Sequence, residues 1–355
     1  MKKLVIVLFL LTLVLLAYEQ RATIALRIAP VAIEAAMSGN RLEELGNGLH
    51  VVLCGAGGPM PDPKRSSACV AVAAGNELFV VDAGTGGVRN LARMRFPLGN
   101  IGAVFLTHFH SDHIDGLGEM AMMRWVSGAN TEPLAVHGPA GVKQVVEGFN
   151  ETYAADAGYR NAHHGDTVAP LSGTGMTPIE FPLPEKGQSL VIYQKGDLRV
   201  ETIAVDHFPV KPAVAYLFHY RGRSVLISGD TVKSKNIEKF ARGIDLLVHE
   251  ALAPNLVHIM NAAAGKVGDK RMEKITHDIL DYHATPVQAA ETARDAGVGH
   301  LLYYHIVPPL ILPGAKAAWL EGVDEVFTNY TVGQDGTTFT LPPNSDEIIK
   351  VGSSL

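Results

Sequence analysis

The chain of 355 residues contains only two cysteines, Cys54 and Cys69. So few thiols exclude a disulfide-dense scaffold, a four-cysteine zinc module and an iron–sulfur cluster held wholly by cysteines. An excess of positive charge is also lacking, because 30 Lys and Arg are set against 36 Asp and Glu and the net charge is -6. The composition therefore provides no overall attraction to nucleic acid. The two cysteines could pair if the chain is exported, and two buried free thiols are an equally good interpretation.

The remaining composition is that of an ordinary globular enzyme. Hydrophobic residues make up 47% of the chain, with 36 Gly and 20 Pro, which excludes a disordered or fibrous protein. The length is sufficient for one large domain or two modest ones. The unusual number is 15 histidines, and their positions decide the functional interpretation.

The N-terminus is typical of an export signal. Lys2 and Lys3 precede an apolar run over residues 4–17, which is shorter than the roughly 20 residues of a membrane span. We expect residues 1–20 to be a signal peptide or signal-anchor, 21–46 a helical connector, 47–345 one large catalytic domain and 346–355 a tail. The body of the protein would then be exported, periplasmic or membrane-anchored facing outward.

Short β-branched runs alternate with helical patterns along the body and predict an α/β fold. We expect helices over 116–125, 140–153 and 286–296, the last with Thr285 as N-cap and Pro286 in its first turn. The stretch 159–188 is rich in Gly, Pro and His and predicts a long loop. Strands are expected over residues 51–53, 70–73, 78–81, 103–106, 134–136, 200–205, 213–218, 224–227 and 246–248.

The most informative motif is His108-x-His110-x-Asp112-His113, which follows the strand expected at 103–106. His108 and His110 can point into one metal site, while Asp112 and His113 can serve a second. Imidazole and carboxylate ligands without thiolate suit zinc, manganese or iron.

Three more ligand candidates follow other strands: His207, Asp230 and His305. A two-metal hydrolytic site needs a bridging carboxylate, and Asp230 is the natural candidate. The sequence therefore predicts two divalent metal ions, with zinc the first choice.

These motifs resemble the metallo-β-lactamase superfamily, an αββα sandwich of two mixed β-sheets. The segments at 54–59, 81–86, 137–141, 249–251 and 282–285 further resemble its ribonuclease Z and arylsulfatase-like branch. The resemblance spans residues 49–306, with the motifs in the expected order.

The resemblance implies a role for each candidate residue. His108, His110 and His207 would hold one metal, and Asp112, His113 and His305 the other, with Asp230 bridging and Asp82 supporting the ligands. His283 and Glu250 match the pair that assists protonation of the leaving group, so the catalytic residues would be His283, Glu250 and Asp112.

We expect an exported or membrane-anchored metal-dependent hydrolase of small sulfate or phosphate esters, arylsulfatase-like, with a metal-bridged hydroxide as nucleophile. Tyr153, Asp156 and Arg160 resemble the arylsulfatase-like proteins. The segment 150–190 is net negative, which disfavours phosphate-rich RNA. The expected partner is a small anionic ester and no nucleic acid, with anchoring through residues 4–17 and a homodimer both possible.

Three alternatives remain open. One is a phosphodiesterase of the ribonuclease Z or cyclic-nucleotide type. Another is a hydrolase of carboxylic esters, lactones or β-lactams, which uses the same metals on acyl carbon. The third is a non-catalytic exported metal-binding protein.

Overall fold

The computed structural model describes residues 2–353 and 355, and the chain divides into two compact units between Arg41 and Leu42. The first unit contains α1 (Lys2–Glu19) and α2 (Arg21–Ser38). Large apolar side chains of α1, such as Leu4 and Phe9, are more than 60% exposed. No single helix in the described chain is long and apolar enough to cross a membrane, although α1 and residues 21–35 together, as a bent pair, have the length and composition.

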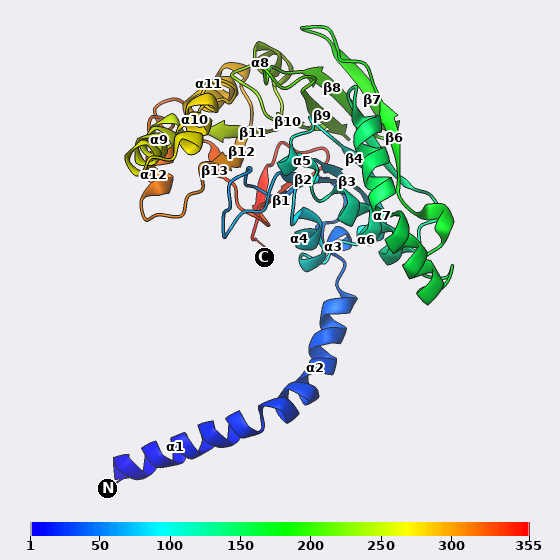
Figure 1. Cartoon of the computed structure of the whole chain (residues 1–355), viewed down its shortest axis with the longest axis vertical. Helices are drawn as coiled ribbons and strands as arrows, with labels where there is room; N and C mark the ends of the chain where they lie inside the picture. Colours follow the sequence, from blue (N-terminus) through cyan, green and yellow to red (C-terminus); the bar gives the residue numbers. More distant parts are fainter. Residues whose placement is uncertain (1, 354) are drawn as a thin grey trace. The chain divides into compact units, whose positions relative to one another are not determined.

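The second unit is built on two mixed β-sheets (Figure 1). The first has the strand order β15-β14-β1-β2-β3-β4-β5-β6, and its strands β3 to β6 run parallel. Its strands are β1 (Leu49–Gly55), β2 (Cys69–Ala74), β3 (Glu77–Val81), β4 (Ile101–Phe105), β5 (Leu134–Gly138), β6 (Met176–Glu180), β14 (Thr338–Leu341) and β15 (Ile349–Val351).

The second sheet has the order β13-β12-β11-β10-β9-β8-β7, with β10 to β13 parallel. Its strands are β7 (Ser189–Lys195), β8 (Leu198–Ala204), β9 (Val214–Tyr220), β10 (Arg223–Ile227), β11 (Leu246–Leu252), β12 (His300–Val307) and β13 (Tyr330–Val332). Every strand expected from the sequence lies in one of the two sheets.

Helices cover the outer face of each sheet, which gives the predicted αββα sandwich. Apolar side chains of α4 (Gly87–Arg93), α6 (Leu117–Gly128) and α7 (Val142–His164) pack in one cluster with the first sheet. Those of α8 (Lys235–Phe240), α11 (Pro286–Ala296) and α12 (Ala315–Trp319) pack with the second. The remaining helices are α3 (Arg41–Leu45), α5 (Ser111–Ile114), α9 (Pro254–Val267) and α10 (Lys270–Asp278), with 3₁₀ turns at Leu98–Asn100 and Leu171–Gly173.

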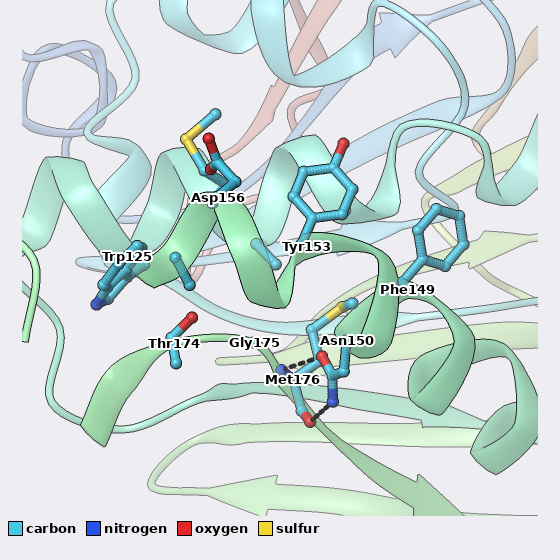
Figure 2. A pocket seen from close by; sticks show the side chains of 12 residues that line it. Trp125, Phe149, Asn150, Tyr153, Asp156, Thr174, Gly175 and Met176 are labelled. Atoms are coloured by element: carbon cyan, nitrogen blue, oxygen red, sulfur yellow. Dashed lines mark hydrogen bonds between the residues drawn. The ribbon is translucent and has the colours of Figure 1, made fainter. Parts of the chain in front are cut away.

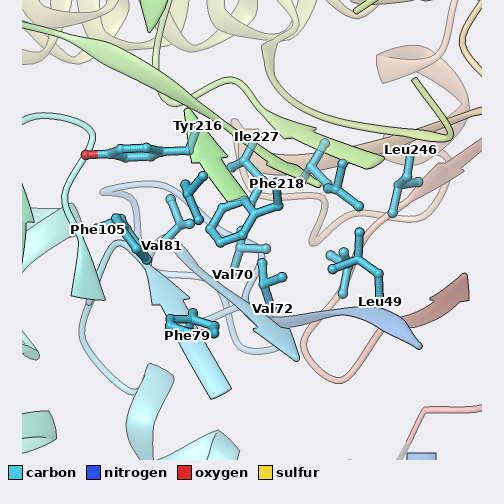
Figure 3. Close-up of a cluster of buried hydrophobic side chains, with 14 of the residues drawn as sticks. Leu49, Val70, Val72, Phe79, Val81, Phe105, Tyr216, Phe218, Ile227 and Leu246 are labelled. Carbon is cyan, nitrogen blue, oxygen red and sulfur yellow. The ribbon is translucent and has the colours of Figure 1, made fainter. Parts of the chain in front are cut away.

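The main core lies between the two sheets, where Phe79 and Phe105 of the first meet Tyr216 and Phe218 of the second (Figure 3). Strand side chains alternate between faces. In β1, for example, Leu49, Val51 and Leu53 enter this core while Val52 and Cys54 enter the helix-covered one. Burial on both faces explains why the central strands are continuously apolar rather than alternating.

The structure bears on three sequence expectations about local structure. Helix α11 begins at Pro286, and Thr285 caps it as predicted. Its Oγ1 accepts a hydrogen bond from Gln288 N, and its own N donates to the Gln288 side chain in return. The long loop expected over 159–188 is wrong in part, because α7 continues to His164 and residues 176–180 form β6. The expected tail contains β15, which pairs with β14 at the sheet edge.

Cys54 and Cys69 form a disulfide between β1 and β2, which lie side by side in the sheet. The bond closes a loop of sequence separation 15, a constraint worth about 3 kcal/mol in the chain-entropy model. The same loop carries the Gly-Pro-rich turn over residues 55–67, so the disulfide ties the two ends of that turn together.

Candidate metal centre and active site

The His-x-His-x-Asp-His segment leaves the carboxyl end of β4 and turns into α5. His108 Nε2 lies 3.0 Å from His110 Nδ1, so these two side chains converge. The carboxylate of Asp112 and Nε2 of His113 are 3.6 Å apart. The first four candidates therefore form two adjacent pairs, as their spacing predicts.

The other three candidates arrive from the second sheet. His207 follows β8, Asp230 follows β10 and His305 lies in β12. His207 Nε2 approaches His110 Nδ1 at 3.4 Å, and His305 Nε2 approaches Asp112 Oδ2 at 3.1 Å. Each pair from the first sheet is thus joined by a histidine from the second, and the structure brings all seven candidates together.

Asp230 lies between the two groups. Its Oδ2 is 3.3 Å from His113 Nε2 and 3.4 Å from His305 Nε2. The same oxygen is 3.8 Å from Nε2 of both His108 and His207. One carboxylate oxygen therefore faces both sets of imidazoles, which is the placement that a bridging ligand needs.

Unusual backbone conformations set the side-chain directions of two of these residues, His305 and Asp230. In β12 the register with β11 skips His305, so this residue is the extra one of a β-bulge, and its φ is +45°. A bulge re-aims a side chain in this way and is common beside active sites. Gly58 permits the approach, because a Cβ there would lie 2.9 Å from the His305 ring. Gly229 precedes Asp230 with φ +59°, and a Cβ on it would lie 2.8 Å from the Val214 carbonyl.

A second set of contacts holds the imidazoles in orientation. Asp82, with φ +59°, accepts hydrogen bonds from Thr107 N and from His113 Nδ1, each at 2.8 Å. An ionised carboxylate can only accept, so the His113 ring donates through Nδ1 and turns its Nε2 toward Asp230. His207 Nδ1 is likewise 2.8 Å from the Tyr282 carbonyl. Such outer contacts fix the tautomer of a metal-ligating histidine.

Burial and charge set the protonation of the group. Burial lowers the pKa of His108, His110 and His207 below the ordinary value, which keeps these imidazoles neutral. For His113, burial acts against the charge but is outweighed by Asp230, Asp82 and Asp112, so its pKa is raised.

His305 and Asp230 show the same balance of burial and charge. Burial lowers the pKa of His305, but Asp230 and Asp112 outweigh it and raise the value. The Asp230 pKa is held well below its usual range, because His305 and His113 outweigh its burial.

The residues present fit a pair of divalent cations. His113 Nε2 and Asp230 Oδ1 are buried and have no hydrogen-bond partner within the described chain. A buried polar atom without a partner costs free energy, and a cation would supply the missing interaction. Five imidazoles and two carboxylates form the N,O donor set that zinc, manganese and iron accept.

His283 and Glu250 lie at the edge of this centre. His283 Nδ1 is 3.3 Å from Glu250 Oε2, at ion-pair distance although not aligned for a hydrogen bond. Glu250 is fully buried, and its other oxygen accepts from Ala284 N at 2.8 Å. A ring nitrogen of His283 lies within 4.8 Å of ligand atoms of Asp230 and His305. The structure therefore places the predicted proton-transfer pair against the ligands.

Asp335 is a site-supporting residue that sequence reasoning missed. Its carboxylate accepts hydrogen bonds from Ala56 N, Ser66 N and the Asn90 amide, at 2.7–3.0 Å. Asp335 thereby holds the Gly-Pro-rich turn that contacts His305 through Gly58. It stands in an ordinary-looking Gly-Gln-Asp-Gly turn, 279 residues from Ala56, so no local signal identifies it.

The stretch from Glu151 to Arg160, on which the substrate expectation rests together with the Gly-Pro turn, has a packing role. Figure 2 shows Tyr153 and Asp156 on the wall of a cavity between α6 and α7. That cavity holds about 20 Å³, room for a single water rather than a substrate. Arg160 pairs with Asp156 at 2.7 Å.

Two acidic residues of the 150–190 segment also hold local structure through hydrogen bonds. Glu180 accepts from Gly141 N at the start of α7, and Asp166 accepts from the Asn161 amide. Because these carboxylates hold local structure, the summed charge of the segment does not describe a substrate surface.

The chain matches the family model described as "Beta-lactamase superfamily domain" over residues 78–306. Among its relatives is the ribonuclease Z of Mycolicibacterium gilvum, 36% identical over 273 residues, which covers 76% of this chain and 88% of that protein. The ribonuclease Z of Mycobacterium bovis is 35% identical over 76% of this chain and 90% of its own.

Solved structures show the same fold. The metallo-β-lactamase fold protein YhfI from Bacillus subtilis has a TM-score of 0.59 at 19% identity, covering 83% of this chain and 100% of that one. The short form of human tRNase Z also has a TM-score of 0.59 at 19% identity, covering 82% and 99%.

These relatives correct two expectations. The prediction of an arylsulfatase-like enzyme that acts on small esters is wrong, because these relatives are named ribonuclease Z. The prediction that nucleic acid is not a partner is wrong for the same reason. It took the acidic segment 150–190 for the substrate surface, although carboxylates of that segment hold local structure.

We predict that Asp82→Asn lowers the affinity for divalent metal roughly 10- to 100-fold. The amide has the same size but presents a donor to groups that also donate, so His113 loses its orientation. The measurement is metal retention during titration with a chelator. Asp115→Asn, at an exposed carboxylate nearby, serves as the matched control; equal retention by both variants would contradict the role of Asp82.

The fold, the arrangement of the candidate ligands and the relatives all indicate the same kind of protein. The protein is a metal-dependent hydrolase that acts on ester bonds, and its His and Asp cluster suits divalent metal ions. The chain belongs to the metallo-β-lactamase superfamily, among its ribonuclease Z relatives.

Proposed function

We propose that this protein is a ribonuclease Z-type phosphodiesterase that cleaves RNA. One observation carries the proposal: a complete seven-residue cluster centred on Asp230 stands in a chain 36% identical to a ribonuclease Z over 88% of that protein's length. Hydrolysis of carboxylic esters, lactones or β-lactams would use the same cluster but has no support from these relatives.

In this proposal His108, His110 and His207 would hold one divalent cation, and Asp112, His113 and His305 would hold the other. Asp230, whose carboxylate lies between the two groups, would serve both. Zinc is the first choice, since imidazole-rich sites with carboxylates suit it. When bound, two such cations activate water and neutralise the charge that develops on a phosphodiester.

His283 would donate the proton that the leaving oxygen needs. Glu250 faces Nδ1 of the ring, which leaves Nε2 free to donate. The Glu250 carboxylate orients the ring in this way, so that Nε2 can deliver a proton to the leaving oxygen. Glu250 itself is fixed by Ala284 N and acts as a positioning residue.

The test compares a precursor tRNA with an aryl sulfate and a cephalosporin as substrates of the full chain. We predict RNA cleavage without turnover of the other two. Asp230→Asn should lose both metal and cleavage, because it removes the shared negative charge, whereas Asp115→Asn should keep both. Intact RNA in the presence of fully metal-loaded protein would overturn the proposal.

A second prediction concerns His283. His283→Ala should retain metal and lose cleavage roughly 10²- to 10⁴-fold on RNA, whose sugar alkoxide is a poor leaving group. The loss should be much smaller on bis(p-nitrophenyl) phosphate, whose phenolate leaves without protonation. Equal losses on the two substrates would show that His283 is not the general acid.

We also propose that the catalytic unit lies outside the cytoplasm. Two observations support this. One is the exposed apolar helix α1, which begins with Lys2 and Lys3, and the other is the Cys54–Cys69 disulfide, a bond that persists in oxidising compartments.

The full chain carrying alkaline phosphatase at its C-terminus, a reporter active only outside the cytoplasm, tests this location. We predict activity that disappears when residues 2–20 are deleted. A reporter silent in the full chain would refute the location and leave the nuclease proposal untouched.

A further inference from the structure

A groove rich in lysine lies next to the metal centre. It has a volume of about 470 Å³, and four of its lining residues are lysines against one carboxylate, Asp206. The lysines are Lys186, Lys211, Lys233 and Lys235. Such a concentration of positive charge stands out in a chain of net charge -6.

The floor of the groove is formed by the loops that carry two of the candidate ligands. Asp206 immediately precedes His207, and Val232 stands two residues after Asp230. Thr231 Oγ1 and Val232 N both donate to the Asp206 carbonyl, which joins the two loops. Two peptide steps span at most about 8 Å, so the groove begins close to the backbone of the candidate ligands His207 and Asp230.

Two of the four ammonium groups remain available for a ligand. Lys233 is paired with Glu291 at 2.6 Å, and Lys235 with Glu238 at 2.7 Å. Lys186 and Lys211 are exposed, and neither forms an ion pair with any residue that the structure describes. An anion that enters the groove can therefore bind both without breaking an ion pair.

An exposed aromatic ring stands beside these charges. Phe208 directly follows His207 and is 64% exposed, and Lys211 Nζ lies 4.9 Å from its ring centre. An apolar ring of this size is usually buried, so its exposure directly after a candidate metal ligand suggests a ligand surface. Lysines along a groove with an aromatic ring for stacking are the features that bind single-stranded nucleic acid.

We propose that this groove binds a single-stranded segment of the RNA substrate, with backbone phosphate on Lys186 and Lys211 and a base stacked on Phe208. The inference rests on the proposed function and adds to it the surface that guides the strand to the metal centre. It also locates positive charge that the overall composition conceals.

The test uses Lys186→Ala/Lys211→Ala and Phe208→Ala in the full chain. For each, kcat/KM is measured on precursor tRNA and on bis(p-nitrophenyl) phosphate, and Kd on a single-stranded RNA oligonucleotide over a range of salt. We expect the ratio of the two kcat/KM values to fall at least tenfold for the lysine pair. The slope of log K against log salt should become shallower by about 1.4, since each single-strand phosphate contact contributes about 0.7.

Phe208→Ala should weaken RNA binding roughly tenfold with no change in the salt slope, and Phe208→Trp should restore it, because any aromatic face can stack. The matched control is Lys143→Ala/Lys274→Ala, at two exposed lysines of α7 and α10, which should leave both quantities unchanged.

The outcomes separate the two proposals. If wild-type protein cleaves RNA and the lysine pair behaves like its control, the groove proposal is wrong and the function stands. If the pair abolishes inhibition by inorganic phosphate but leaves RNA binding intact, the groove binds free phosphate and the proposal is again overturned. If wild-type protein binds and cleaves no RNA, both fail.

Discussion

The structure of the active centre depends on one carboxylate. Asp230 Oδ2 lies within 3.3–3.8 Å of four imidazole nitrogens, two from each ligand group. Without that negative charge, five converging histidines would repel one another as soon as any two were protonated. Gly229 reaches the conformation that delivers this carboxylate, and no larger residue fits between Val214 and Thr107.

The sandwich supplies the two halves of the centre. Parallel strands place their carboxyl ends at a common edge, and ligands of α/β proteins gather there. β4 contributes the His-x-His-x-Asp-His segment, while the second sheet contributes His207, Asp230 and His305. The core between the sheets, where Phe105 packs on Tyr216 and Phe218, fixes the distance between the halves. Packing far from the chemistry thus sets the ligand geometry.

The strands of the body and the candidate metal ligands could be predicted from the sequence, for a physical reason. The run 107–113 is mostly polar and directly follows an apolar strand, so its His and Asp residues stand out. Other strand-end His and Asp residues can likewise be recognised by the apolar strands before them. Asp335 could not be found, because its contacts depend on the pairing of β1 with β14. The substrate could not be predicted either. The summed charge of 150–190 ignored that Asp156 and Glu180 hold local structure of α7. It also ignored that Lys186 of this segment lines one groove with Lys211 outside it.

The central claim is that Asp230 and its six neighbours hold two cations which together cleave RNA. The most direct measurement strips the full chain of metal and follows RNA cleavage as zinc is added back. The account predicts that cleavage reaches its plateau at two equivalents per chain. Full cleavage without added metal, a plateau at one equivalent, or two bound equivalents with intact RNA would contradict it.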